Sequence, residues 1–239
     1  MIHLRIRSSK AGKVRFASHR DIAKVWERTL RISNVPMIYS QGFSPRPKIA
    51  YGLALPTGSE SDCEYIDIQI DNSENEFLNV EEVCASLNEN LPIGIKINGV
   101  SIMEGKVPSL QQTVTSCIWD IAVNEDNTTV DSWLDTINTS SEIVIVRERK
   151  GKKVVDDIKP LVHSVRKKVK KEDGRVVVEA ELGTQPRSLR PSEFLRSVEP
   201  SLTEYKLRRR KQIVEEGAKR LDPLEVAGAT RMRTLIGAS

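Results

Sequence analysis

A loop that combines aromatic, proline and basic residues carries the clearest chemistry in the sequence. It reads YSQGFSPRPK over residues 39–48. The rings of Tyr39 and Phe43 can stack on bases, the charges of Arg46 and Lys48 can pair with phosphates, and two prolines hold the backbone extended. The loop therefore predicts binding of single-stranded RNA or of a structured RNA end. The alternative is a proline-braced loop that packs Phe43 into the core.

A histidine near the start of a basic segment is the second candidate. Histidine side chains in general titrate near neutrality and can act as general bases, so His19 is a candidate, with Asp21 as the carboxylate that orients it. Two residues apart on a helix, however, the two side chains point in different directions. Ser18 and Asp21 fit a capping box that starts a helix. We therefore expect His19, with Arg20 beside it, to contact RNA, and keep His19 as a candidate catalytic residue.

A second loop repeats the combination of glycine, proline and arginine. The stretch LGTQPRSLRPSEFL covers residues 182–195 and places Arg187 and Arg190 before a predicted helix. The amino end of a helix favours anions. We predict phosphate contacts for both arginines, with an ordinary helix-capping loop as the alternative.

The charge is divided unevenly along the chain. The net charge of +4 is the balance of +9 over residues 1–51, −15 over 52–146 and +10 over 147–239. Basic surface set apart in this way suits a polyanion. The alternative is that the basic and acidic faces balance each other within the folded molecule.

Several classes of protein are disfavoured by the composition. No apolar run approaches the length that spans a membrane, and the first ten residues carry charges inside their apolar run, unlike a secretory signal. We expect a cytoplasmic protein. Cys63, Cys84 and Cys117 lack any C-x-x-C spacing, so they predict reduced apolar residues and no metal site or cofactor.

The elements that must position these residues follow from the hydrophobic periodicity. A helix over 19–33 would bury one face and expose a basic one. Its predicted inner face holds Ile22, Val25, Trp26, Thr29 and Leu30, and its outer faces hold Arg20, Lys24, Arg28 and Arg31. Alternating segments on either side predict the order β-α-β-β-α-β.

The same order of elements recurs in the second half of the chain. We therefore predict an α+β protein of two ferredoxin-like (βαββαβ) halves in tandem. The predicted domains are residues 1–105 and 117–203, joined by a linker over 106–116 and followed by a basic, partly disordered tail over 204–239. At the level of fold this resembles the RAMP-like, repeat-associated RNA-binding proteins of CRISPR systems.

The motifs of the first 65 residues resemble one bacterial family. The pattern runs R-F-x-S-H, then D, an E-R helix, P-x-x-Y-S-x-G-F-x-P-x-P, L-P-x-G and E-Y. The matching residues are Arg15, Phe16, Ser18, His19, Asp21, Glu27, Arg28, Pro36, Tyr39, Ser40, Gly42, Phe43, Pro45, Pro47, Leu55, Pro56, Gly58, Glu64 and Tyr65. With later matches in LNENLPIGI, PSL and LRPSEFL, the likeness to the radical SAM-linked, or radical SAM-associated, protein family covers residues 1–200.

The resemblance implies a partner rather than a reaction. Proteins of this kind are fused behind a radical SAM protein or accompany it as a separate chain, and their activity is not established. The cluster-binding C-x-x-x-C-x-x-C motif is missing from this sequence, so the radical SAM chemistry would belong to the partner. Arg20 departs from the family pattern, which has an apolar residue there, and RISNVP replaces a more Arg/Ala-rich helix end.

Three functions are compatible with these observations. The first is an RNA-binding accessory protein that works with a separate radical SAM protein in RNA modification or processing. The second is a metal-independent ribonuclease or RNA-modifying enzyme that uses His19. The third is a protein–protein adaptor whose acidic middle segment meets a basic partner, without a role for nucleic acid.

Overall fold

The chain folds into two compact units, which are described separately. The computed structural model describes residues 1–73, 79–105, 108–149, 151–169 and 172–233. Unit 1 comprises Met1–Val114 with Ile213–Ser239, and unit 2 comprises Thr115–Gln212. Both units combine antiparallel strands with few helices, so the predicted α+β class is confirmed.

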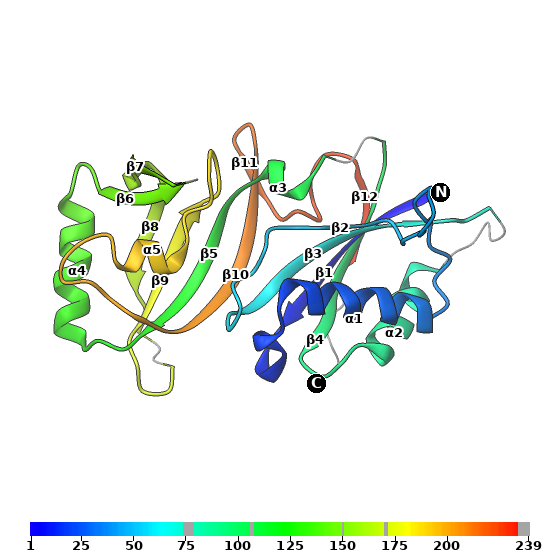
Figure 1. Cartoon of the computed structure of the whole chain (residues 1–239), viewed down its shortest axis with the longest axis horizontal. Coiled ribbons are helices and arrows are strands. Elements are labelled where there is room, and N and C mark those ends of the chain that lie inside the picture. The colour runs from blue at the N-terminus through cyan, green and yellow to red at the C-terminus, as the bar shows by residue number, and fades with distance from the viewer. Residues whose placement is uncertain (74–78, 106–107, 150, 170–171, 234–239) are drawn as a thin grey trace. The chain divides into compact units, whose positions relative to one another are not determined.

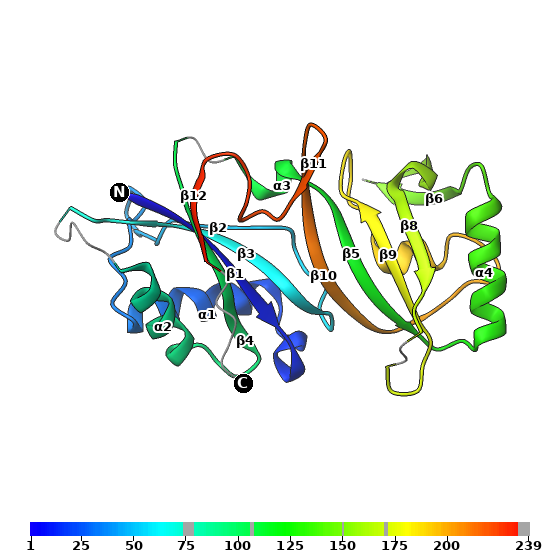
Figure 2. The same ribbon diagram turned by 180° about the vertical axis from the view of Figure 1, so that it is seen from behind.

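Unit 1 is an antiparallel sheet with two main helices. Its elements are β1 (Ile2–Lys10), η1 (Gly12–Phe16), α1 (His19–Ile32), β2 (Ile49–Tyr51), β3 (Glu60–Ile70), α2 (Val80–Asn90), β4 (Ile95–Met103), α3 (Leu110–Thr113), β11 (Lys219–Leu221) and β12 (Ala229–Arg233). The strands follow the order β12-β4-β1-β3, with β2 paired to β3. Figures 1 and 2, from opposite sides, show α1 and α2 on the same face of this sheet.

The core of unit 1 lies between this sheet and its helices. Leu4 and Ile6 point from β1 toward α1, where Trp26 and Leu30 are buried. Ile22 and Val25 pack partly buried against the same cluster, so the predicted inner face of the helix is confirmed. Alternation along a strand sends neighbouring side chains to the opposite face.

The opposite face of β1 carries a buried ion pair. The guanidinium of Arg5 donates to both carboxylate oxygens of Asp67 at 2.8 and 2.9 Å, and both side chains are buried. Its remaining contacts are the carbonyl oxygens of Pro223 at 3.1 Å and Pro108 at 3.4 Å. Four of the five N–H groups of the Arg5 guanidinium thus donate to acceptors, which offsets the cost of burying the charge.

The carboxyl-terminal segment is structured, which corrects the prediction of a tail from residue 204. Residues 204–216 form the long strand β10 (Glu204–Glu216), and β11 and β12 follow it. Asp222 accepts hydrogen bonds from the Tyr65 hydroxyl at 2.9 Å and from Arg7 at 2.7 Å. The end of the chain thus completes unit 1, while residues 234–239 lie outside the described part.

Unit 2 is also built mainly of β-strands. Its elements are β5 (Val114–Val123), α4 (Asn127–Thr139), β6 (Val144–Arg149), β7 (Lys152–Asp157), η2 (Lys159–Leu161), β8 (Val162–Lys167), β9 (Val177–Gly183), α5 (Pro191–Leu195) and the first part of β10. The strand order is β10-β5-β9-β8, and β6 and β7 pair separately as a hairpin. The predicted linker over residues 106–116 therefore contains α3 and the start of β5. Its residues 106–107 lie outside the described part of the chain.

Two aromatic rings join the helices of unit 2. Trp133 of α4 and Phe194 of α5 are buried and meet edge to face, with ring centroids 5.0 Å apart. The three cysteines of the chain, all within the described residues, are buried and form no disulfide, in agreement with the prediction of reduced residues. No helix in the described residues is long and apolar enough to cross a membrane.

Candidate functional site

The loop over residues 39–48 is closed by its own backbone. Tyr39 pairs with Pro47 in an isolated β-bridge, and the Ser40 amide donates to the Arg46 carbonyl at 2.9 Å. The Ser40 hydroxyl accepts from the Arg46 amide at 3.1 Å. Gly42 at the turn has φ +142°, a conformation that side chains rarely adopt. The loop therefore presents its side chains from a braced frame, which leads directly into β2.

Both aromatic rings of the loop face solvent. Phe43 is fully exposed and Tyr39 is 47% exposed. The alternative in which Phe43 packs into the core is therefore wrong. The Phe43 ring is therefore accessible to a ligand.

The two predicted phosphate contacts of this loop are not neutralised by acids. Arg46 and Lys48 are exposed, and in the described residues neither side chain makes a hydrogen bond or ion pair. Their hydrogen bonds are made by the backbone, with Ser40 for Arg46 and with Ile38 and Gln69 for Lys48. Two cations and two open rings thus share one short loop.

A row of cations runs along the exposed side of α1. Residues three or four apart share one side of a helix. The α1 stripe, as we name it, consists of Arg20, Lys24, Arg28 and Arg31 together with Glu27. Its net charge is therefore +3, and its length is about 16 Å at 1.5 Å per residue. In the part of the chain described, none of its four cations makes a hydrogen bond or ion pair.

The hydrogen bonds at the start of α1 explain why the side chains of His19 and Asp21 do not interact with each other. The Ser18 hydroxyl accepts from the Asp21 amide, and the Asp21 carboxylate accepts from the Ser18 amide at 3.1 Å and hydroxyl at 2.6 Å. These hydrogen bonds from Ser18 lower the pKa of Asp21. The predicted capping box is confirmed, and Asp21 is occupied by it, so His19 and Asp21 form no dyad.

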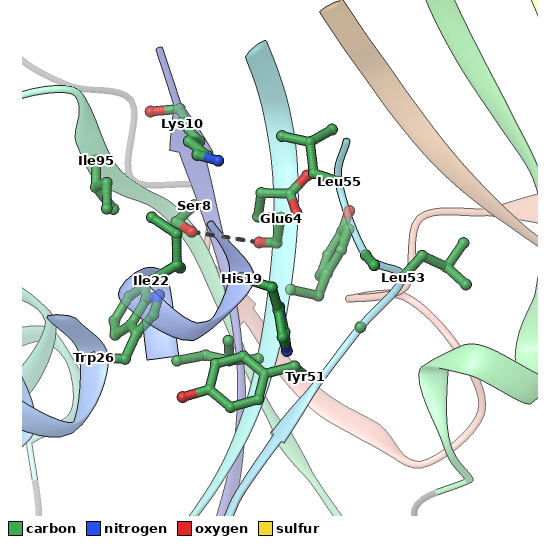
Figure 3. A pocket seen from close by; sticks show the side chains of 15 residues that line it. Ser8, Lys10, His19, Ile22, Trp26, Tyr51, Leu53, Leu55, Glu64 and Ile95 are labelled. Carbon is green, nitrogen blue, oxygen red and sulfur yellow. Dashed lines mark hydrogen bonds between the residues drawn. The ribbon is translucent and has the colours of Figure 1, made fainter. Parts of the chain in front are cut away.

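His19 instead lines a pocket beneath the first turns of α1 (Figure 3). Its ring meets Tyr51 edge to face, with centroids 5.2 Å apart. Ile22 and Trp26 form the wall on the helix side, and the segment after β2 forms the facing wall. The space open to water is about 40 Å³, enough for roughly three water molecules at about one per 10–15 Å³.

The polar groups of this pocket were missed by the sequence analysis. Figure 3 shows Lys10 and Glu64 on one side of the pocket and Tyr51 with His19 on the other. Lys10 is buried and donates to the Ala17 carbonyl at 2.9 Å, and burial raises the pKa of Tyr51. The alternation of Ile49 and Tyr51 in β2 was the signal that could have placed Tyr51 under the helix.

Arg187 in unit 2 is held by acids. Its guanidinium donates to Asp156 at 3.0 Å and to Glu193 at 2.8 Å. Arg147 binds the same oxygen of Asp156, and this hydrogen bond together with the charge of Arg187 lowers the pKa of that carboxyl. The predicted phosphate contact of Arg187 loses support, because carboxylates already engage its Nε and Nη1 groups. Its buried Nη2 has no hydrogen-bond partner among the described residues.

Arg190 lies close to Arg187 but differs in its surroundings. It is the exposed N-cap residue of α5, and within the described ranges its side chain has no ion pair. With Arg147, Arg187 and Arg196 it lines a polar hollow of about 480 Å³ that also contains Glu148 and Glu193. Of the eight predicted RNA-contacting residues, Tyr39, Phe43, Arg46 and Lys48 share one loop, His19 and Arg20 begin α1, and Arg187 and Arg190 belong to unit 2.

Metal ligands do not gather in the structure as far as it is described. Across those residues, no group of three or more His, Cys, Asp or Glu side chains is placed to hold a metal ion.

Comparisons with known proteins identify a family but no function. No curated protein matches the chain. A solved structure described as "Crystal Structure of a Cbf5-Nop10-Gar1 Complex" matches with 10% identity and a TM-score of 0.48, over 87% of this chain and 48% of that chain. This chain thus spans about half the length of that one, and the likeness is too weak to support an argument.

A family model covers most of the chain. It matches residues 3–191, which include the loop, α1, the pocket and Arg187. The chain belongs to the family described as "Uncharacterized protein conserved in bacteria (DUF2344)".

Proposed function

We propose that the protein binds RNA through unit 1 and serves as an accessory protein in RNA modification or processing. The observation that carries this proposal is the loop over 39–48. It holds two open aromatic faces and two cations without acidic partners on a braced backbone. Proteins bind unpaired RNA with this combination, since rings stack on bases and cations pair with phosphates.

The α1 stripe supports the proposal from a second element. Four cations over about 16 Å match the regular charges of a nucleic-acid backbone better than a single acidic ligand. The loop follows α1 in the chain after only six residues. Loop and stripe together would supply base stacking and phosphate neutralisation from one unit.

The prediction of two ferredoxin-like halves is part of this proposal. In unit 1 the order β4-β1-β3-β2, and in unit 2 the order β10-β5-β9-β8, are what a ferredoxin-like βαββαβ chain gives when its fourth, first, third and second strands lie side by side. We propose two such halves in tandem, with a hairpin added in unit 2 and the chain end added to unit 1.

The partner in this proposal is a separate radical SAM protein. Its support is the sequence pattern around Ser18-His19 and the 39–48 loop, as set out above. Co-purification from the native host after nuclease treatment tests it. Recovery of a chain with a C-x-x-x-C-x-x-C motif is expected, and repeated recovery of none would contradict the partnership.

The RNA-binding proposal is tested with a labelled single-stranded RNA of mixed sequence. Fluorescence anisotropy at several salt concentrations should show binding that weakens as salt rises, because phosphate contacts release counterions. Phe43→Ala should lower the affinity by about 5- to 150-fold, the loss of one stacked base at 1–3 kcal/mol.

Ile93→Ala is the matched control, since Ile93 is also fully exposed but lies between α2 and β4, outside the loop. Equal effects of the two substitutions, or no measurable affinity for any RNA, would contradict the proposal.

A second candidate function is favoured by one observation, the place of His19 at the mouth of a pocket that also holds Lys10 and Glu64. These groups could exchange protons with a bound RNA. RNA turnover that His19→Ala abolishes while affinity persists would establish this enzyme. Unchanged products from that variant would exclude it.

A further inference from the structure

We infer that the pocket beneath the first turns of α1 receives one unpaired base of the bound RNA. The inference rests on the proposed function and adds a base-specific site to it. The location is the first argument. His19, Ile22 and Trp26 line the pocket from the same helix whose outer side carries the α1 stripe, and Arg20 at the start of that stripe follows His19 directly.

The chain also links the pocket to the loop. β2 covers the three residues from Ile49 to Tyr51, so Lys48 at the end of the loop and Tyr51 in the pocket lie about 10 Å apart at 3.3 Å per residue. A single strand held by the loop could therefore continue along β2 and reach the pocket. β2 pairs on one side with β3, and no partner on its other side is described.

The lining suits a flat group with a polar edge. The walls are apolar or aromatic, from Ile22, Trp26, Tyr51 and Leu55. Polar atoms gather on the opposite side, where the Lys10 ammonium can donate and the Glu64 carboxylate can accept (Figure 3). The exposed edge of an unpaired base carries donors and acceptors next to each other, whereas its faces are apolar.

The size of the pocket requires one movement. About 40 Å³ holds roughly three waters and is too small for a whole base. His19 is exposed, and within the described residues its ring contacts Tyr51 without a hydrogen bond. The imidazole can rotate away at little cost, and its departure widens the mouth and exposes the Tyr51 ring. His19 is thus the side chain that a base displaces.

Two probes test this inference. The first is a set of single-stranded RNAs in which one base at a time is removed. One position should lose between about five- and 150-fold in affinity because the base in the pocket is removed, and this loss, unlike that at a base stacked on the 39–48 loop, should vanish when the pocket is blocked. The second probe is each of the four nucleoside monophosphates, followed by the NMR signals of the His19 ring, which should shift with saturation.

Ala54→Phe is the blocking variant. Ala54 lies exposed at the pocket, so a larger side chain can close the mouth without displacing the core. It should abolish both the His19 shift and the position-specific loss, while the salt-dependent affinity that depends on Phe43 persists. Ala85→Phe, exposed on α2 and outside the pocket lining, is the matched control and should change neither.

The outcomes separate this inference from the proposed function. Salt-dependent RNA binding with no His19 shift, and with abasic losses that are the same in the natural protein and in Ala54→Phe, would overturn the base pocket and leave the RNA-binding loop intact. Absence of RNA binding would overturn the proposed function. A nucleotide-induced His19 shift that Ala54→Phe removes would then still assign a nucleotide pocket, whereas no shift would overturn both.

Discussion

Two loops of this protein share a glycine, prolines and arginines, yet the fold treats their charges in opposite ways. In unit 1 the Arg46 side chain is exposed and, in the described residues, without an acidic partner. In unit 2 the Arg187 guanidinium is shared between Asp156 and Glu193. Similar short sequences thus give an open cation in one unit and a structural ion pair in the other.

The difference shows that the neighbouring carboxylates, and not the local sequence motif, determine whether an arginine side chain is available to bind a phosphate. Arg187 meets Glu193 because a helical turn brings it back, and meets Asp156 because the β6–β7 hairpin ends beside it. Arg46 lies in a segment without acids between Glu27 and Glu60. An arginine already held by carboxylates has little left to offer a phosphate.

The largest effect is expected from removing the carboxylate that pairs with Arg5, the buried arginine of unit 1. Asp67→Ala leaves the buried Arg5 charge without its carboxylate and should destabilise unit 1 by about 3–5 kcal/mol. Urea unfolding monitored by circular dichroism measures it. Glu179→Ala, which removes the partner of the 72%-exposed Arg166, is the control and should cost no more than about 1 kcal/mol. Similar midpoints for both variants would contradict the account of Arg5.

Arg187→Ala should lower the free energy of unfolding of unit 2 and leave the affinity for RNA unchanged. The substitution leaves the half-buried Asp156 and Glu193 short of a donor, so unit 2 should lose about 1–3 kcal/mol on unfolding. Arg190→Ala, three residues away and exposed, should change the unfolding free energy by less than about 0.5 kcal/mol. A stable Arg187→Ala protein with weakened RNA binding would reverse the contrast between the two loops.

The α1 stripe should show a smaller and graded effect on RNA affinity. Arg28→Ala removes one cation and should lower the slope of log affinity against log salt by about 0.7, as one phosphate contact with a single strand does. Lys219→Ala, an exposed cation of β11, should leave the slope unchanged. A slope insensitive to Arg28 would restrict the interface to the loop.

Acid should weaken unit 2 through Asp156. The hydrogen bond from Arg147 lowers the pKa of this carboxyl below its usual 3.8. Its contribution is therefore complete above that value and is lost as the pH falls through the lowered pKa. The difference in urea midpoint between the natural protein and Asp156→Asn should shrink between about pH 5 and pH 2. A constant difference over this range would contradict the pairing.

Local patterns in the sequence were sufficient for the helix α1 and for several strands of unit 1. The capping box of Ser18 and Asp21 and the periodic face around Trp26 depend on residues within a few turns of one helix, so they were predicted correctly. The strand over Ile95–Met103 agrees with its alternation. The exposure of Phe43 could not be derived, because it depends on whether the core has room for another ring.

Long-range partners explain what the sequence analysis missed. β10 was mistaken for a tail because its basic residues interrupt the apolar alternation, yet Arg209 is buried with its guanidinium 5.5 Å from the Trp119 ring. Asp222 meets Tyr65 across 157 positions of the chain. No local sequence pattern predicts such a long-range contact. The meeting of Lys10 and Glu64 in the pocket could not be predicted for the same reason.

The most direct test of the central claim compares the salt dependence of RNA affinity in three proteins. The natural chain, Arg46→Ala and Arg187→Ala are titrated with one single-stranded RNA between low and moderate salt. The account predicts that Arg46→Ala lowers the slope of log affinity against log salt by about 0.7 and that Arg187→Ala leaves it unchanged. Equal slopes for all three, or a reduction confined to Arg187→Ala, would contradict it.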